Sequence, residues 1–259
     1  SMVLIARQSK EQLRELSMTR ILIIANDEST ILNFRCEILQ DFVKEGFEVI
    51  VCYPLGKNTS VITNIGCEVI DLDVSRHGTN VLKDLRLLNN CVKLIKKYKP
   101  DVVLTYTVKP NIYGSLACQL TKTPYINNVT GLGSVLQKES LLSKLILAMQ
   151  KIAYRNSACV FFQNSENCET LRLRGVINKK TPVQILPGSG VNLEMQSVEP
   201  YPDDDGIIRF IIVSRIRVDK GYHEFFDAAD FIKKKYPNTE FHVVGWYEEE
   251  ELRKRVEDL

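Results

Sequence analysis

Residues 20–52 read RILIIANDESTILNFRCEILQDFVKEGFEVIVC, and this stretch decides the fold. It opens with a continuous apolar run at 21–25, and its apolar residues then follow helical spacing over 30–45 until Gly46 ends the helix. A second apolar run follows at 48–52. Two short apolar strands joined by a helix are typical of a parallel sheet covered on both faces, because parallel strands need a crossover connection.

The same alternation of apolar runs and amphipathic segments continues along the chain. Further strands are expected at 68–70, 102–105, 125–128, 158–162 and 183–186. Further helices are expected at 59–65, 81–98, 111–120, 141–154 and 166–174. Glycine or proline ends several of these helices, as is common. The pattern predicts an α/β fold, a doubly wound Rossmann-like domain.

A second pattern of strands and helices begins after a polar linker. Prolines and three successive aspartates mark residues 196–206 as that linker. The elements expected after it are a strand at 208–213, a helix at 223–235, a strand at 241–244 and a charged helix running to Leu259. We therefore expect an N-terminal domain at 18–195 and the beginning of a second Rossmann-like domain, truncated, at 207–259. An incomplete sheet leaves apolar surface exposed, which predicts self-association through this second domain.

Residues 1–17 are charged and helix-like, and Ser1 before Met2 is typical of a tag, so we set this extension aside. The 259 residues are 44% apolar and 25% charged with a net charge of +2, which is ordinary for a globular protein and gives no indication of nucleic-acid binding. The seven scattered cysteines form no C-x-x-C pair, so the sequence predicts no metal site, and no cofactor is expected. Free thiols favour a reducing cytoplasm.

Candidate ligand-binding residues follow the expected strands, because ligands bind beyond the carboxyl ends of an open parallel sheet. They are Asn26, Asp27, His77, Lys109, Asn111, Thr130, Gly131 and Gly133, with Gly188 and Gly190 as a hinge. Lysine and asparagine suit sugar or phosphate oxygens, and glycines let backbone N–H groups approach a ligand. Structural interpretations stay open: Ser29 or Thr30 as a helix N-cap, His77 as a surface residue, and the glycines as turn residues.

Arg215 and Lys220 lie where the strand at 208–213 passes into the helix at 223–235. The planar fork of arginine and the point charge of lysine, close to the positive end of a helix dipole, suit a phosphate group. This turn predicts a nucleotide-binding site.

Several stretches, taken in order, resemble the retaining glycosyltransferases of the GT-B fold, family four, and most closely members that build capsule, O-antigen and N-glycan precursors. The stretches are 22–27, 76–80, 104–114, 128–133, 161–164, 186–192 and Ser214-Arg215 with Asp219-Lys220-Gly221. The resemblance implies two Rossmann-like domains facing each other across a cleft. The first would bind an acceptor and the second a nucleotide sugar such as a UDP-sugar. Arg215 and Lys220 match the family's pair that holds the donor diphosphate.

The chain departs from the family in two ways. Thr130 stands where many members carry a histidine that touches the donor sugar, and the second-domain E-x7-E motif is expected beyond Leu259. The Glu248–Glu251 cluster is interpreted as a solvated face of the terminal helix. The resemblance implies an enzyme that transfers a hexose or acetamido-hexose to a lipid-linked acceptor with retention, in the cytoplasm or at the inner face of the plasma membrane. Its catalytic residues are unknown, and we expect this chain alone to have little activity.

Two other functions stay open. One is a non-catalytic subunit that binds an acceptor or anchors a partner at the membrane. The other is a sugar-nucleotide epimerase on the same fold, for which only His77 is available as a histidine of the cleft. The helix at 141–155 carries an apolar stripe beside lysines, which fits either peripheral contact with an anionic membrane or packing of the stripe on the sheet. The stripe consists of Leu141, Leu142, Leu145, Ile146, Met149 and Ile152.

Overall fold

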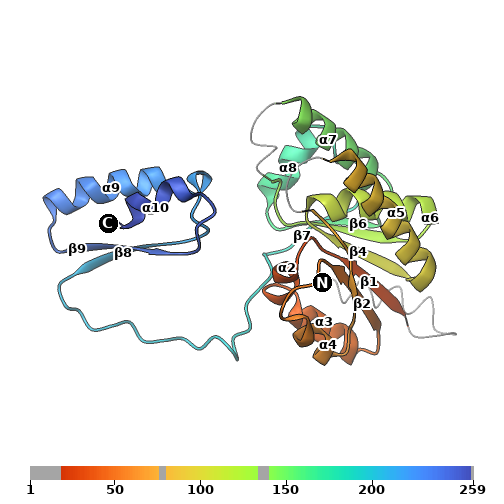
Figure 1. Cartoon of the computed structure of the whole chain (residues 1–259), viewed down its shortest axis with the longest axis horizontal. Helices are drawn as coiled ribbons and strands as arrows, with labels where there is room; N and C mark the ends of the chain where they lie inside the picture. The colour runs from red at the N-terminus through yellow and green to blue at the C-terminus, as the bar shows by residue number, and fades with distance from the viewer. Residues whose placement is uncertain (1–18, 76–79, 134–139, 258–259) are drawn as a thin grey trace. The chain divides into compact units, whose positions relative to one another are not determined.

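The computed structural model describes residues 19–75, 80–133 and 140–257 (Figure 1). The chain divides into two compact units, Ser1–Gln196 and Ser197–Leu259, and each is described by itself. The extension expected at 1–17 and the candidate site residue His77 lie outside the described residues.

The first unit is built on a parallel sheet with the strand order β3-β2-β1-β4-β5-β6-β7 (Figure 1). Its strands are β1 (Arg20–Ile24), β2 (Glu48–Tyr53), β3 (Glu68–Asp71), β4 (Val102–Tyr106), β5 (Tyr125–Val129), β6 (Cys159–Phe162) and β7 (Val183–Ile185). Each apolar run of the sequence forms a strand, which confirms the doubly wound α/β fold. The strand order reverses between β1 and β4, and open sheets bind their ligands outside the carboxyl ends of the strands at such a point.

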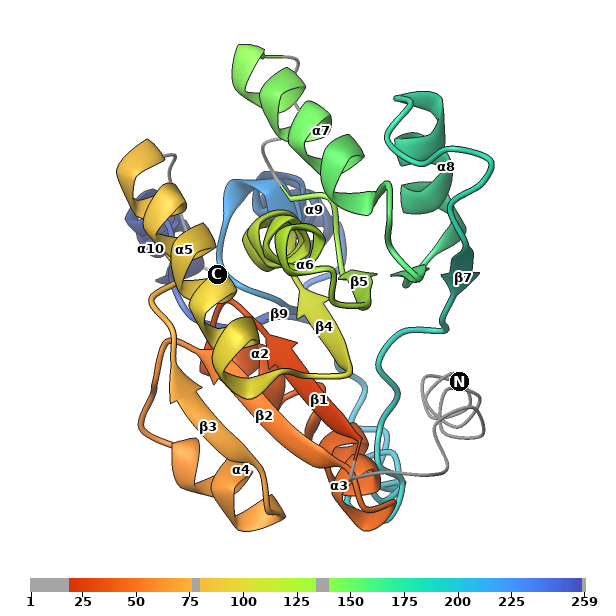
Figure 2. The ribbon, with the colours of Figure 1, turned by 90° about the vertical axis from the view of Figure 1, so that its right-hand side faces the viewer.

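Helices cover both faces of this sheet (Figure 2). They are α2 (Glu28–Leu32), α3 (Cys36–Lys44), α4 (Thr59–Ile65), α5 (Val81–Tyr98), the π-helical turn η1 (Pro110–Gly114), α6 (Ser115–Thr121), α7 (Leu141–Tyr154) and α8 (Ser165–Leu173). The helices α2, α3 and α4 pack against the face that carries Ile21 and Ile23. The helices α5 and α6 pack against the opposite face, with Leu22 and Ile24, and α7 and α8 extend that layer over β6.

The helix expected over 30–45 is in fact two helices, because residues 33–35 form a turn in which Arg35 leaves helical geometry, with a φ angle of −136°. In an unbroken helix Arg35 would share a face with Ile31 and Leu39, which are both buried against the sheet. A guanidinium buried there among apolar side chains would lack the hydrogen-bond partners that a buried polar group needs. The break instead makes Arg35 the N-cap residue of α3, and its guanidinium reaches the loop that follows β7.

The helix expected after β4 begins as η1 and continues as α6, and its wide first turn joins a buried hydrogen-bond network. Thr105 of β4 donates to Asn111 Oδ1 at 2.6 Å. Asn127 of β5 donates from Nδ2 to Thr105 Oγ1 at 2.8 Å and to Ser115 Oγ at 2.7 Å. Gly114 permits this close approach, because a Cβ there would lie 2.9 Å from the Thr105 Cγ2 atom.

The apolar stripe expected on α7 is divided between core and solvent. Ile146 packs against the core cluster of β6 and α8. Leu141 is 87% exposed, and Leu145 and Ile152 are also exposed. The interpretation that the whole stripe packs on the sheet is therefore wrong. Among the helices in the described ranges, none has the length and apolar character needed to cross a membrane.

The seven cysteines are all free thiols, and six of them are buried. Burial raises the pKa of the Cys67 thiol to about 11 and that of Cys91 to about 12. These thiols therefore stay protonated at neutral pH and pack as small apolar side chains.

The second unit pairs β8 (Ile208–Val213) with β9 (Thr239–Val244) in parallel. Its helical segments are η3 (Val218–Lys220), α9 (Tyr222–Lys235), η4 (Glu250–Leu252) and α10 (Arg253–Glu257). The rings of Phe210 and Phe241 stack with 4.8 Å between centroids on the face that α9 covers. The other face exposes Ile211, Val213 and Val244. This apolar face is consistent with the expected self-association, which stays a prediction.

We predict that Asn127→Ala lowers the free energy of unfolding of the first unit by about 2–4 kcal/mol, because it leaves buried hydroxyls unpaired and opens a cavity. Urea unfolding followed by circular dichroism measures this. Asn89→Ala, at an exposed position of α5, is the control and should change stability by less than about 0.5 kcal/mol. Equal stability of the two variants would show that the network does not stabilise the first unit.

Trp246 is the only tryptophan of the sequence and lies in the second unit, so its fluorescence follows the unfolding of that unit separately.

Candidate functional site

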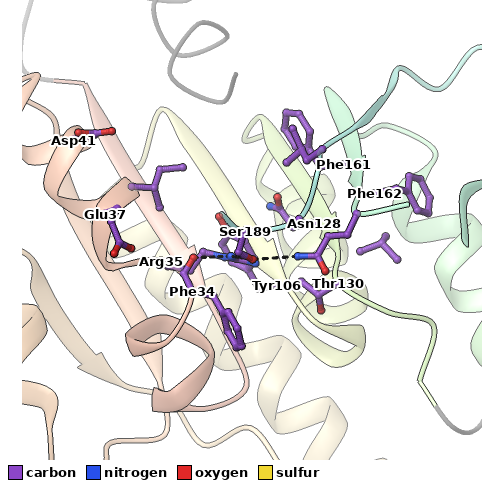
Figure 3. Close-up of a pocket in the computed structure, with 15 residues that line it drawn as sticks. Phe34, Arg35, Glu37, Asp41, Tyr106, Asn128, Thr130, Phe161, Phe162 and Ser189 are labelled. Carbon is purple, nitrogen blue, oxygen red and sulfur yellow. Dashed lines mark hydrogen bonds between the residues drawn. The ribbon is translucent and has the colours of Figure 1, made fainter. Parts of the chain in front are cut away.

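A groove opens at the carboxyl ends of β4 to β7, between these strands and α3 (Figure 3). Its volume is about 290 Å³, close to the lower end of the roughly 300–1,000 Å³ of small-molecule sites. We name it the Arg35 groove. Its lining residues are Phe34, Arg35, Glu37, Ile38, Asp41, Tyr106, Asn128, Val129, Thr130, Phe161, Phe162, Gln163, Leu186, Gly188 and Ser189.

Arg35 is the central side chain of this groove. It is only 8% exposed, and its Cζ atom lies 4.6 Å from the centroid of the Tyr106 ring. Its Nη1 donates to the carbonyl of Phe34 at 2.6 Å and to Ser189 Oγ at 2.7 Å, whereas Nε has no hydrogen-bond partner. No carboxylate in the described part of the chain lies within ion-pair distance of it. Burial lowers the pKa of Arg35, and the neighbouring Tyr106 opposes this shift.

Ser189 connects two walls of the groove. Its Oγ accepts a hydrogen bond from Arg35 and a second one, at 3.3 Å, from Nε2 of Gln163 (Figure 3). Since the oxygen accepts twice, the hydroxyl proton of Ser189 is left to donate to another group. Gly188 and Gly190 on either side have φ angles of +82° and +78°, and this left-handed geometry bends the loop around Ser189.

The backbone is strained next to the groove. Thr107, directly after Tyr106, has a φ angle of 72°, which is rare for a β-branched residue, and its hydroxyl is buried without a partner. Such strain clusters at functional sites. Burial raises the pKa of Tyr106 against the opposing effect of Arg35, so the phenol stays protonated at neutral pH.

The groove is suited to a polar organic ligand. Its base carries N–H and O–H donors from Arg35, Ser189 and Gln163, and the carboxylates of Glu37 and Asp41 lie along α3 (Figure 3). Donors and acceptors in one groove suit a molecule with several oxygens, such as a sugar. Within the ranges that the structure describes, no three histidine, cysteine, aspartate or glutamate side chains are grouped so that they could hold a metal ion.

The structure places some of the sequence-predicted residues at this groove. Thr130 and Gly188 line it directly. Gly131 and Gly133 follow Thr130, and a Cβ built on Gly131 would meet no atom within 4 Å. Gly133 has a φ angle of +78°, so this loop needs glycine for its backbone geometry.

Asn26 and Asp27 are engaged in the start of α2. Asp27 is the N-cap residue, and its carboxylate accepts from the backbone N–H of Thr30 at 2.8 Å and from the hydroxyl of Ser29 at 2.5 Å. The Thr30 hydroxyl donates to Asn26 Oδ1 at 3.1 Å. The cap is therefore Asp27 rather than Ser29 or Thr30, because its carboxylate reaches the free N–H groups of the first turn.

Lys109 and Asn111 are held by the framework of the sheet. Lys109 Nζ donates to Asp84 at 2.8 Å and to Ser75 at 2.7 Å, and the ion pair with Asp84 is mostly buried. Asn111 is 1% exposed; its Oδ1 accepts one hydrogen bond and its Nδ2 donates another to the carbonyl of Asn128 at 2.9 Å. Neither residue lines the Arg35 groove.

The predicted anion site of the second unit already holds a carboxylate. Nη1 of Arg215 and Nη1 of Arg217 lie 3.1 and 3.2 Å from the two oxygens of Glu248. Partial burial opposes ionisation of Glu248, but the hydrogen bonds and charges of the two arginines outweigh it and hold its pKa below the usual value. Glu248 thus lies in a turn before η4, and the interpretation that it is on a solvated helix face is wrong. Lys220 is exposed and forms no ion pair with any described residue.

Gly245 lets the two turns of this site meet. A Cβ on Gly245 would lie 1.8 Å from the carbonyl oxygen of Ser214, so no other residue fits without a backbone shift. Just beyond this contact the backbone N–H of Ile216 donates to the carbonyl of Trp246 at 2.9 Å. This close packing holds Arg215 opposite the turn that carries Glu248.

Arg35, Gln163 and Ser189 were not among the residues predicted from the sequence. One signal was present, since Arg35 stands four residues after Ile31 and four before Leu39 and so interrupts the apolar face of the expected helix. A charge at such a position conflicts with local patterning, and such conflicts are typical of functional sites. Gln163 and Ser189 lie in the stretches 161–164 and 186–192 that carry the resemblance. Their contact with Arg35 could not be predicted, because they reach it only through the strand order of the sheet.

Known proteins are similar to this chain in sequence and in fold. The glycosyl transferase 4-like family matches residues 20–164. An uncharacterized glycosyltransferase of Methanocaldococcus jannaschii is 24% identical over 194 residues, which are 68% of this chain and 46% of the relative. The chain therefore spans about half the length of this curated relative.

Solved structures share the fold at low sequence identity. A putative UDP-N-acetylglucosamine 2-epimerase of Listeria monocytogenes has a TM-score of 0.63 and 16% identity, over 94% of this chain and 66% of that chain. Anabaena HepE in complex with UDP has a TM-score of 0.63 and 15% identity, over 93% of this chain and 64% of that chain. Because the family match covers more than half of the residues, from β1 to the end of β6, the chain belongs to the glycosyl transferase 4-like family.

Proposed function

We propose that this chain serves a glycosyltransferase that moves a hexose from a UDP-sugar to a lipid-linked acceptor, with retention, at the inner face of the plasma membrane. The acceptor sugar binds in the Arg35 groove of the first unit. The donor diphosphate binds to Arg215 and Lys220 in the second unit, where the two positive charges stabilise the negative charge that develops on the leaving group. Membership of the glycosyl transferase 4-like family supports sugar transfer.

The observation that carries this proposal is the contact between Arg215 and Glu248. It supports anion binding because the guanidinium already holds a carboxylate, whose paired oxygens resemble those of a phosphate. The pair is partly exposed, so an incoming diphosphate displaces it at a cost of about 0.2–1 kcal/mol. Lys220 on η3 adds a second positive charge just before α9 begins.

The exposed apolar side chains of α5 and α7 support a lipid-linked acceptor. Both helices begin at the carboxyl edge of the sheet, as crossover helices do, and α6 lies between them (Figure 2). The exposed apolar residues are Val81, Leu82 and Leu85 of α5 and Leu141, Leu145 and Ile152 of α7. Lys144 and Lys151 of α7 are exposed beside them. An apolar surface with a basic rim suits the interface of an anionic bilayer.

An epimerase acting on a UDP-sugar is the second candidate, and the fold shared with a putative UDP-N-acetylglucosamine 2-epimerase favours it. The two functions differ in their need for an acceptor. Proton NMR of UDP-N-acetylglucosamine incubated with the protein in the absence of an acceptor separates them. An epimerase changes the sugar stereochemistry under these conditions, whereas a transferase leaves the sugar configuration of the donor unchanged.

We predict that UDP binding changes the fluorescence of Trp246, which is 63% exposed and adjoins the turn that carries Glu248. Arg215→Ala and Lys220→Ala should each weaken UDP binding about tenfold or more, because a charged hydrogen bond contributes roughly 1.5–3 kcal/mol. Lys234→Ala is the matched control, since it removes one positive charge roughly 20 Å away at the far end of α9. Equal UDP affinity in all four proteins would refute the donor site.

Glu248→Gln should bind UDP about two- to fivefold more tightly than the wild type, because the neutral amide no longer competes for Arg215 as strongly as the carboxylate does. The same fluorescence titration measures this change. Glu251→Gln, an exposed residue of η4 with the same change in charge, should have much less effect. Weaker binding by Glu248→Gln would instead mean that Glu248 contacts the ligand.

The wild-type protein should float with vesicles that contain anionic lipid. Lys144→Glu combined with Lys151→Glu should abolish flotation, because each basic residue contributes about 1 kcal/mol near an anionic surface. Lys44→Glu with Lys57→Glu carries the same change in charge at exposed positions on the α3 and α4 side of the sheet and should still float. If the wild type stays with the soluble fraction, the apolar surface does not bind membrane.

A further inference from the structure

The Arg35 guanidinium is a buried charge without a counter-ion. It is about nine-tenths buried, yet no carboxylate of the described ranges lies within 4.0 Å of it. Removing an ion from water without a partner is strongly unfavourable. Its contacts with a ring face, a carbonyl and a hydroxyl orient it but do not neutralise it. A charge retained in this way at an open groove indicates a ligand that neutralises it.

The polar atoms next to the guanidinium are also donors. The Ser189 oxygen accepts hydrogen bonds from both Arg35 and Gln163, so its own proton is directed to a third group. The Gln163 amide has a second N–H beyond the one used on Ser189. The helix α3 begins directly after Arg35, and the positive end of its dipole adds to the charge. The base of the groove is therefore rich in donors and suits a pair of anionic oxygens.

The wall formed by α3 carries hydrogen-bond acceptors rather than donors. Glu37 and Asp41, one helical turn apart, line the groove without pairing with Arg35 (Figure 3). Their oxygens accept hydrogen bonds from hydroxyl groups and repel a second negative charge. Phe34 and Phe161 add apolar surface. A ligand with one negative charge and several hydroxyls fits this distribution, whereas a phosphate dianion does not.

We propose that the Arg35 groove binds a hexuronic acid, with the sugar carboxylate on Arg35 and Ser189 and the sugar hydroxyls toward Glu37 and Asp41. This names the chemical class of the acceptor, and it rests on the proposed function only for the role of acceptor. The charged guanidinium suits a carboxylate because charge-assisted hydrogen bonds are stronger than neutral ones, and the Ser189 proton supplies a further donor.

Titration of the 259-residue chain with methyl glucuronoside, methyl glucoside and glucose 6-phosphate tests the proposal, with binding followed by calorimetry. The glucuronoside should bind saturably and at least about tenfold more tightly than either of the other two sugars. Arg35→Met should weaken glucuronoside binding about tenfold or more, and Ser189→Ala about two- to tenfold. Arg172→Met, an exposed arginine of α8, is the matched control and should bind as the wild type does.

Thermal unfolding of the wild type and of Arg35→Met without ligand shows whether Arg35 serves ligand binding or the stability of the fold. Because Arg35 is an unneutralised buried charge, Arg35→Met should keep or raise the Tm. The glucuronoside should raise the Tm of the wild type but not that of Arg35→Met. A large fall in the Tm of free Arg35→Met would mean that Arg35 is structural, and this would overturn the proposal.

A parallel UDP titration distinguishes the two proposals. If UDP fails to bind but the glucuronoside binds through Arg35, the donor site is wrong and the uronic acid site stands. Three results overturn the uronic acid site alone: equal binding of glucuronoside and glucoside, preference for glucose 6-phosphate, or absence of saturable glucuronoside binding.

Discussion

The hydrogen bonds among Thr105, Asn111 and Asn127 hold the carboxyl edge of the central strands, and the groove depends on them. Thr105 and Asn127 are opposite each other on β4 and β5, and Asn111 joins them from η1. Tyr106 and Asn128, the next residues along each strand, both line the groove. Buried side chains linked by several hydrogen bonds favour a single arrangement, although Asn127 Oδ1 has no partner among the described residues. The position of the ring beneath the guanidinium therefore follows from this network.

The two candidate sites place arginine in different electrostatic settings. Arg35 is buried without a carboxylate, whereas Arg215 is partly exposed and paired with Glu248. Low local dielectric strengthens the interaction of a buried charge with a ligand, but the empty site carries the desolvation penalty. A partly exposed pair costs little to separate. The first setting suits selective recognition of one charged group, and the second suits a ligand that binds and leaves readily.

The fold could be predicted from the sequence more fully than the site. Apolar runs identified each strand, because both faces of a parallel sheet are covered and the strands are therefore apolar throughout. The break before Arg35 and the π-helical start after β4 were missed, since contacts with Ser189 and Asn127 override the local preference for a regular helix. Thr130 and Lys109 both follow the end of a strand, but Thr130 lines the groove and Lys109 forms an ion pair with Asp84. Position at the end of a strand therefore does not determine what a side chain contacts.

By itself the sequence determined the succession of strands and helices and the doubly wound class of the fold, because these follow from local periodicity and turn chemistry. It also placed Arg215 and Lys220 in one turn, since they are neighbours along the chain. Only the tertiary structure decided which side chains form the groove. Arg35 and Ser189 are 154 residues apart in the chain. They meet because right-handed crossovers bring the carboxyl ends of parallel strands, and the loops that follow them, to one edge of the sheet.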